Sequence, residues 1–237
     1  MSLKQELINE VDDLFKGNYV IHTRTKIPDI EDIHLDKHGE ELELAMLFID
    51  IRDSTGIINN LGRLITAKIY KSFILGVAKI AKENRGELRG FNGDGILIAF
   101  SKESKSSDAL SAAFQMSWFM KHILKPKVEE YFQTHPKLKH SLFNFGIGID
   151  IDKVLVIRAG ISGKYSNDLV WVSKATSNAA KLASLSAKPE SNLFNIFITG
   201  DIFSKIRETV TSSMSFWEEG LWNNIPIYQS NHSVELA

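Results

Sequence analysis

The pattern of apolar and polar positions along the chain predicts two long helices and a series of short, mostly apolar strands. One helix is expected over residues 57–81, where Ile65 and Ile69 recur at helical spacing. A second is expected to begin near Asp108 as its N-cap and to bend or end at Pro126. Shorter helices are predicted over 4–15, 176–184 and from Asp201; strands are predicted over 45–51, 87–91, 96–100, 143–150, 153–157, 169–172 and 193–199, with a closing hairpin over 216–228.

A tight hairpin is predicted at the turn Asn92-Gly93-Asp94-Gly95, which lies between two apolar strands, because Asn-Gly pairs adopt the positive φ that such turns need. The order of strand, helix, hairpin, helix, strands, short helix and strand predicts an α+β fold. Helices would pack on a mostly antiparallel sheet of ferredoxin-like βαββαβ type. We expect residues 1–40 to form an N-terminal helix and an irregular segment, and residues 41–237 to form one domain.

Composition narrows the classes of protein that the chain can belong to. The 28 basic and 29 acidic side chains nearly balance, which argues against a protein that coats nucleic acid. Cysteine is absent, which excludes disulfides, cysteine-ligated zinc and thiol nucleophiles and is consistent with a cytoplasmic location. The apolar runs are too short to span a bilayer, so we expect no direct membrane insertion.

Two carboxylates are the main candidates for chemistry. Asp50 ends the first apolar strand and Asp94 lies in the hairpin turn. If the hairpin pairs beside that strand, the two acids converge on one edge of the sheet, where hard divalent cations would relieve their repulsion. Two ions about 3.5–4 Å apart can activate an attacking hydroxyl and stabilise a pyrophosphate leaving group. The alternative is a strand-end residue and an ordinary turn-forming Asp.

A candidate anion site follows directly after the first strand. Ser54, Thr55 and Gly56 are small residues that lead into the long helix. Backbone N–H groups at a helix N-terminus bind anions, and small side chains let phosphates approach closely. An ordinary Ser or Thr N-cap explains the same residues equally well.

Several segments together resemble the catalytic domain of class III adenylate and guanylate cyclases. FIDIRDST and, further along, FNGDGILIAF resemble the first strand and second hairpin of that family. The following segments fall in the same order: FGIGIDIDKVLVIRAG, LVWVSKATSNAAKLAS, FITGDIFSKI and GLWNNIPIYQS. The resemblance covers about residues 41–230 and implies a class III nucleotidyl cyclase domain, with the order of motifs far more specific than any one of them.

By that resemblance, Asp50 and Asp94 bind two Mg²⁺ or Mn²⁺ ions together with the carbonyl of Ile51. The segment Ser54–Gly56 would hold the triphosphate. The ribose 3′-hydroxyl would then attack the α-phosphorus in line, with catalysis by positioning and charge stabilisation, to give a 3′,5′-cyclic monophosphate and pyrophosphate. The family is similar in working as head-to-tail homodimers whose sites are shared across the interface.

The family's Asn-x-x-x-Arg pair, which orients the ribose and stabilises charge on the α-phosphate, falls on Ser177 and Lys181. Asn178 is displaced from the first of these positions by one residue. Lysine keeps the charge of arginine but loses its bidentate fork. We assign catalysis to Ser177, Asn178 and Lys181. The same departures leave open an inactive cyclase-like module that regulates a partner.

The base-reading positions depart from those of purine cyclases. The lysine of adenylate cyclases is replaced by Gly90, beside Arg89, and their adenine-reading Asp falls near Val170. A site that lacks these hydrogen-bonding groups loses purine specificity. RGFNGDG with VWVSKA resembles the pyrimidine cyclases of the Pycsar anti-phage system, whose cyclic UMP or cyclic CMP signals to a separate effector.

We expect Arg89 to donate to a pyrimidine carbonyl, although a solvated strand residue is the alternative. UTP is the preferred substrate by the resemblance, and CTP is the next. A purine cyclase with an unusual base pocket, making cyclic AMP or cyclic GMP, is the remaining enzymatic alternative.

Overall fold

The structure is a computed structural model that describes residues 1–134, 143–163, 166–187, 194–207 and 215–236. The chain divides into two compact units. The smaller consists of residues 1–43 and 153–173, and the larger of residues 44–152 and 174–237. The expected division into domains at residue 40 stays a prediction. No helix in the described part of the chain is both long and apolar enough to cross a bilayer.

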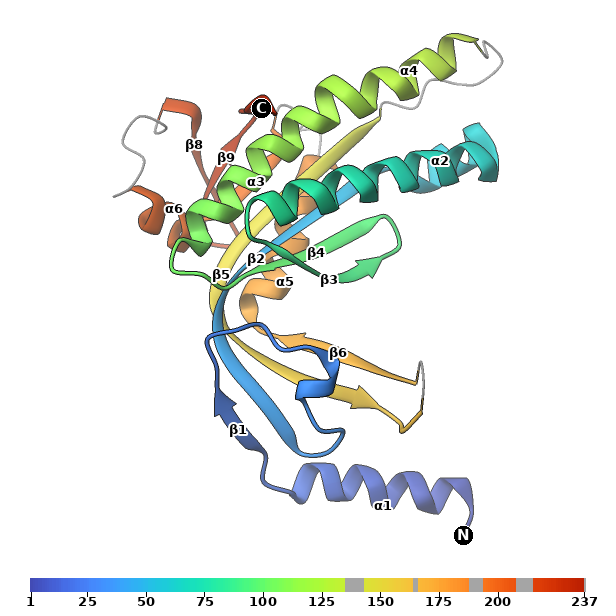
Figure 1. Cartoon of the computed structure of the whole chain (residues 1–237), viewed down its shortest axis with the longest axis vertical. Helices are drawn as coiled ribbons and strands as arrows, with labels where there is room; N and C mark the ends of the chain where they lie inside the picture. The colour runs from blue at the N-terminus through green and yellow to red at the C-terminus, as the bar shows by residue number, and fades with distance from the viewer. Residues whose placement is uncertain (135–142, 164–165, 188–193, 208–214, 237) are drawn as a thin grey trace. The chain divides into compact units, whose positions relative to one another are not determined.

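The elements alternate along the chain as an α+β protein (Figure 1). The helices are α1 (Leu3–Lys16), α2 (Ser54–Glu83), α3 (Lys105–Phe119), α4 (Lys125–Thr134), α5 (Lys174–Ala183) and α6 (Gly200–Arg207), with the 3₁₀ turns η1 (Ile30–Asp32) and η3 (Ser184–Ala187) and the π-helical turn η2 (Met120–Leu124). The strands are β1 (Val20–Thr23), β2 (His38–Arg52), β3 (Glu87–Asn92), β4 (Gly95–Phe100), β5 (Asn144–Gly160), β6 (Asn167–Val172), β7 (Ile196–Thr199), β8 (Glu218–Trp222) and β9 (Ile225–Ser230).

The strands pair in the order β3-β4-β2-β5-β7-β9-β8, with β1 paired to β2 and β6 to β5. Two of these pairings are parallel: β1 with β2, and β5 with β7. The pairings of β4 with β2 and β3, and those of β9 with β7 and β8, are antiparallel. The mostly antiparallel sheet with packed helices confirms the predicted fold class.

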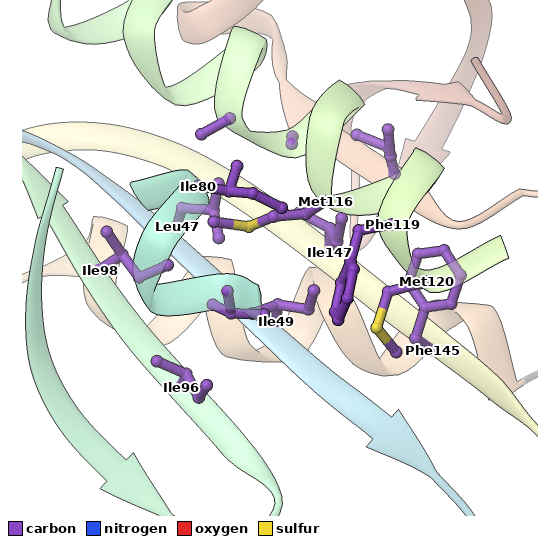
Figure 2. Packing of buried hydrophobic residues seen from close by; sticks show 14 of the residues in the cluster. Leu47, Ile49, Ile80, Ile96, Ile98, Met116, Phe119, Met120, Phe145 and Ile147 are labelled. Carbon is purple, nitrogen blue, oxygen red and sulfur yellow. The ribbon is translucent and has the colours of Figure 1, made fainter. Parts of the chain in front are cut away.

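The main core of the larger unit lies between the sheet and helices α2 and α3, which cover one face (Figure 1). Leu47 and Ile49 of β2 meet Ile96 and Ile98 of β4 there, together with Ile80 of α2, as Figure 2 shows. Side chains alternate along a strand, so the neighbours of these β2 residues point to the opposite face. That face carries the polar residues at the end of β2.

Helix α5 approaches the opposite face of β5 at two glycines. A Cβ atom on Gly146 would lie 1.9 Å from the carbonyl oxygen of Ala183, and one on Gly148 would lie 2.1 Å from that of Ala179. Only glycine allows the helix backbone to come so close to the strand. This contact fixes which residues of α5 face β5 and which face outward.

Helix α2 is bent at Gly62, which has φ 74° and ψ 165° inside an otherwise helical segment. This backbone conformation is essentially restricted to glycine. The first turns of α2, which follow directly on β2, therefore run in a different direction from the remainder. The periodicity of the sequence predicts one helix here and gives no sign of the bend.

The second long helix differs from the expectation at its start, and it continues past Pro126. It begins at Lys105, and Asp108, expected as its N-cap, is instead buried and accepts a hydrogen bond from Arg85 Nε at 3.0 Å. Pro126 does not end the helix but stands in the first turn of α4, just after the π-helical turn η2. Proline has no N–H to donate, and the wider π turn before it accommodates the break in the hydrogen-bond ladder.

Two strand predictions also need correction. The polar stretch before residue 41 contains β1, and the two strands expected over 143–150 and 153–157 are one continuous strand, β5. The predicted hairpin turn over Asn92-Gly93-Asp94-Gly95 is confirmed, because Asn92 pairs with Gly95 and leaves Gly93 and Asp94 as its two central residues. Gly93 takes the positive φ, at 66°.

We predict that Gly62→Ala lowers the free energy of unfolding by about 1–3 kcal/mol, because a Cβ is strained in the backbone conformation of the bend. Urea denaturation measures the change. Gly220→Ala in β8 is the matched control: its Cβ would meet its nearest neighbour at an ordinary 3.6 Å. The control should shift stability by about 0.5 kcal/mol or less. Equal effects of the two substitutions would contradict the bend.

Candidate active site

The antiparallel pairing of β2 with β4 brings the two candidate carboxylates to one turn. Asp50 lies opposite Gly95 in this pairing, directly beside Asp94. The N–H of Ile51 donates to the carbonyl of Asp94 over 3.4 Å. Asp50 is 20% exposed and Asp94 is half-buried, so both remain accessible to a small ligand. The structure thus brings together the three residues that were expected to bind metal.

Arg52 lies on the same face of β2 as Asp50, and its guanidinium forms an ion pair with the Asp50 carboxylate. Burial lowers the pKa of Arg52, and the negative charge of Asp94 opposes that shift. One guanidinium therefore interacts with both carboxylates. Arg52 is not among the site residues expected from the sequence, although its place two residues after Asp50 on a strand puts the two side chains on one face.

Tyr70 approaches the same site from α2, where a hydrogen bond joins its hydroxyl to that of Ser54. Burial raises the pKa of Tyr70, and the nearby charge of Asp94 raises it further. In a straight helix these two residues would lie about 24 Å apart, at 1.5 Å per residue. The bend at Gly62 is what brings them together. The sequence alone gave no signal for this contact.

The N-terminus of α2 is capped by Asp53, a residue not among those expected from the sequence. Asp53 adopts the left-handed conformation, with φ 54°, and its carboxylate accepts a hydrogen bond from the N–H of Gly56 at 3.2 Å. Ser54 is the first helical residue rather than the cap. For Gly56 to donate to a phosphate, the Asp53 side chain must turn away. The phosphate-binding role of Ser54, Thr55 and Gly56 stays a prediction.

Arg89 stands at an irregularity in the hairpin, where the register between β3 and β4 shifts between Leu88 and Gly90. Its side chain is only 13% exposed and forms an ion pair with Glu87. Arg89 is therefore held in place on the strand and is not a freely solvated residue. Its base-reading role stays a prediction.

The three residues expected to be catalytic all lie on helix α5 but face different sides of it. Ser177 and Lys181 are exposed and share one face, since they are four residues apart. Asn178 faces β5 instead, and its amide donates to Asp150 Oδ2 at 2.9 Å. The displaced amide is therefore engaged by the chain's own carboxylate, and the catalytic role of all three residues stays a prediction.

Asp150 is buried and accepts two more hydrogen bonds, from Thr199 Oγ1 at 2.5 Å and from the N–H of Ile151 at 2.8 Å. Burial raises the pKa of Asp150, and the hydrogen bonds from Thr199 and Asn178 oppose that rise. Together with Asn178, Asp150 lines an open pocket of about 770 Å³. The remaining lining residues are Ile151, Asp152, Lys174, Thr199, Gly200, Asp201, Ser204, Ile225 and Pro226.

Asp50 and Asp94 do not line this pocket. The described chain thus carries two separate groups of candidate residues, one at the β2–β4 turn and one around α5. Among the described residues, no cluster of three or more His, Asp or Glu side chains is arranged to hold a metal ion. A cation at the β2–β4 turn would therefore be held by two carboxylates, with backbone and substrate oxygens as its other ligands.

Comparison with known proteins gives a consistent picture. A uridylate cyclase from Xanthomonas perforans is 30% identical over 98% of this chain and 97% of its own length. A uridylate cyclase from Burkholderia cepacia is 28% identical over 96% of each chain. The crystal structure of the adenylyl cyclase CyaB from P. aeruginosa superimposes with a TM-score of 0.62, at 19% identity, over 84% of this chain and 99% of that one. No protein-family model matches the chain.

The fold and these relatives define a class III nucleotidyl cyclase, an enzyme of the phosphorus–oxygen lyase type. Within that class, the chain belongs to the family of the uridylate cyclases. The resemblance found in the sequence motifs is thereby confirmed.

We predict that Asp150→Asn changes how stability depends on pH. Above the ordinary carboxyl pKa the unfolded chain releases the Asp150 proton, while the folded chain keeps it until its raised pKa is reached. Wild-type stability relative to the variant therefore falls as pH rises through this window. Denaturant titrations of both proteins at several pH values from about 4 to 8 measure the difference. A difference that stays constant with pH would contradict the assignment.

Proposed function

We propose that this cyclase converts UTP into 3′,5′-cyclic UMP and pyrophosphate, with two divalent cations held at Asp50 and Asp94. The observation that carries the proposal is the register of β2 against β4, which sets the two acids side by side at one turn. The substrate is proposed from the uridylate cyclases that are 28% and 30% identical over nearly the whole chain.

The donors at the β2–β4 turn suit Mg²⁺ or Mn²⁺. Both side chains are carboxylates, and hard cations prefer oxygen ligands and need few from the protein when phosphates supply the rest. The carboxylate of Asp50 already has a positively charged partner, the guanidinium of Arg52. When bound, the ions would neutralise phosphate charge and favour ionisation of the ribose 3′-hydroxyl.

The protein's own part in the reaction is to position the nucleotide. The first turn of α2 would place backbone N–H groups beside the triphosphate once the carboxylate of Asp53 turns aside. The exposed Ser177 and Lys181 would serve the site of a second copy, because neither belongs to the Asp50 and Asp94 group of its own chain. Lys181 would then donate to the α-phosphate, where charge develops in the transition state. This arrangement requires a homodimer.

A pyrimidine suits the Arg89 and Glu87 pair. Uracil presents carbonyl acceptors and one N–H donor, so a guanidinium and a carboxylate on neighbouring positions of one strand face offer it complementary groups. A role in anti-phage defence, with cyclic UMP read by a separate effector, is proposed from the similarity of RGFNGDG and VWVSKA to Pycsar cyclases. CTP is the next candidate substrate.

The direct test is to incubate the full chain with each of the four nucleoside triphosphates and Mn²⁺ and to identify the products by mass spectrometry. We expect cyclic UMP as the main product. Asp50→Asn and Asp94→Asn should each lower its rate about a thousandfold or more, because each removes a charged metal ligand. Asp12→Asn, on the exposed helix α1, is the matched control and should leave the rate unchanged.

Cyclic AMP or cyclic GMP as the main product would overturn the substrate while leaving the class of enzyme intact. Full activity of Asp50→Asn would contradict the two-cation site.

An inactive, partner-regulating module is the second candidate, favoured by Ser177 and Lys181 at the family's Asn and Arg positions. The double variant Ser177→Asn/Lys181→Arg distinguishes the two. If the wild-type enzyme is active and already uses these residues, we expect the kcat of the double variant to stay within about tenfold of wild type, which corresponds to a change of about 1.4 kcal/mol in the barrier. Activity that appears only in the double variant, with none in the wild-type protein, would favour the inactive module.

A further inference from the structure

Arg52 occupies an unusual place beside the two candidate metal ligands. Strand alternation puts it on the same face of β2 as Asp50, and its guanidinium pairs with that carboxylate. Both side chains are largely buried, at 14% exposed for Arg52 and 20% for Asp50. The charge of Asp94 also raises the pKa of Arg52 against the effect of burial. Arg52 is thus a partly buried residue that interacts with both Asp50 and Asp94.

A carboxylate oxygen that accepts a guanidinium N–H cannot offer the same lone pair to a cation. A guanidinium stays charged at any ordinary pH, so at neutral pH it still competes with a cation for the carboxylate oxygen. Its positive charge also repels a divalent cation that approaches the same oxygens, and partial burial weakens the screening of that repulsion. Arg52 and a metal ion therefore compete for Asp50.

Without a cation, two adjacent half-buried carboxylates would repel each other and destabilise the turn. Arg52 relieves this repulsion within the chain itself. If Arg52 moves aside, its guanidinium remains close to the triphosphate and can donate to phosphate oxygens. A nucleotide would then favour the displacement that metal binding requires.

We propose that Arg52 is a positioning residue: an internal counter-ion of Asp50 and Asp94 that a divalent cation must displace, so that it sets the metal concentration the enzyme needs. This rests on the proposed two-cation function of the same site. The consequence is a site that stays folded at low metal concentration and takes up its cations together with the nucleotide.

The test measures Mn²⁺ binding to the full chain by electron paramagnetic resonance in the absence of nucleotide, so that no catalytic turnover is involved. We expect Arg52→Gln to bind Mn²⁺ about tenfold more tightly than wild type, which is the size of effect that one neighbouring charge exerts. Arg52→Lys, which keeps the charge, should stay within about threefold of wild type. Arg63→Gln, on the exposed part of α2, is the matched control and should bind as wild type does.

Melting in EDTA provides the second readout. Arg52→Gln should melt about 3 °C or more below wild type, and Mn²⁺ should remove most of that difference. If Arg52→Gln folds only when Mn²⁺ is present, the counter-ion role is supported. A variant that folds equally poorly with and without Mn²⁺ overturns it, as does Mn²⁺ binding no tighter than that of wild type.

Asp50→Asn separates this inference from the function on which it rests. If wild type and Asp50→Asn bind Mn²⁺ equally, the two-cation site itself is wrong, and the counter-ion role falls with it. If Asp50→Asn loses Mn²⁺ binding while Arg52→Gln matches wild type, only the role of Arg52 is overturned.

Discussion

The candidate site depends on one constraint, the register of β2 against β4. Side chains alternate along a strand, so a slip of one residue would turn Asp50 into the core and bring Ile49 or Ile51 to the surface. Burial of Leu47, Ile49 and Ile51 against α2 and α3 holds the register, because a slip would expose all of them. The apolar core thus determines where the carboxylate points. Chemistry at the turn follows from packing on the other face of the sheet.

Two further features assemble the surroundings of Asp50 and Asp94. The bend at Gly62 brings the part of α2 that follows it close to the first turn of the helix, so that Tyr70 contacts Ser54. Arg52 supplies a positive charge from the strand itself. Residues of α5 form a second, separate group, held by the close approach of that helix to β5. A single chain thereby presents two separate sets of polar groups, as the proposed homodimer with shared sites requires.

Much of this could be predicted from the sequence, because the fold depends on short-range patterns. The apolar strands and the hairpin at Gly93 predict the fold class. The position of Asp94 in that hairpin predicts that it lies close to Asp50. The missing parts depend on contacts that no local pattern encodes. Gly62 lies in a helical repeat that tolerates glycine. Asp108 is a residue type typical of an N-cap, and the local sequence gives no sign that it pairs with Arg85 instead. Asp53 was passed over because Ser54 and Thr55 are equally good caps by type.

The central claim is that Asp50 and Asp94 together hold paired cations over the phosphates of a nucleotide. A crystal structure with Mn²⁺ and 3′-deoxy-UTP, which lacks the attacking hydroxyl, tests it most directly. Anomalous scattering should place two Mn²⁺ ions about 4 Å apart, with oxygens of both carboxylates about 2.1 Å from them. Manganese bound elsewhere, or a carboxylate of this pair that contacts no ion, would contradict the account.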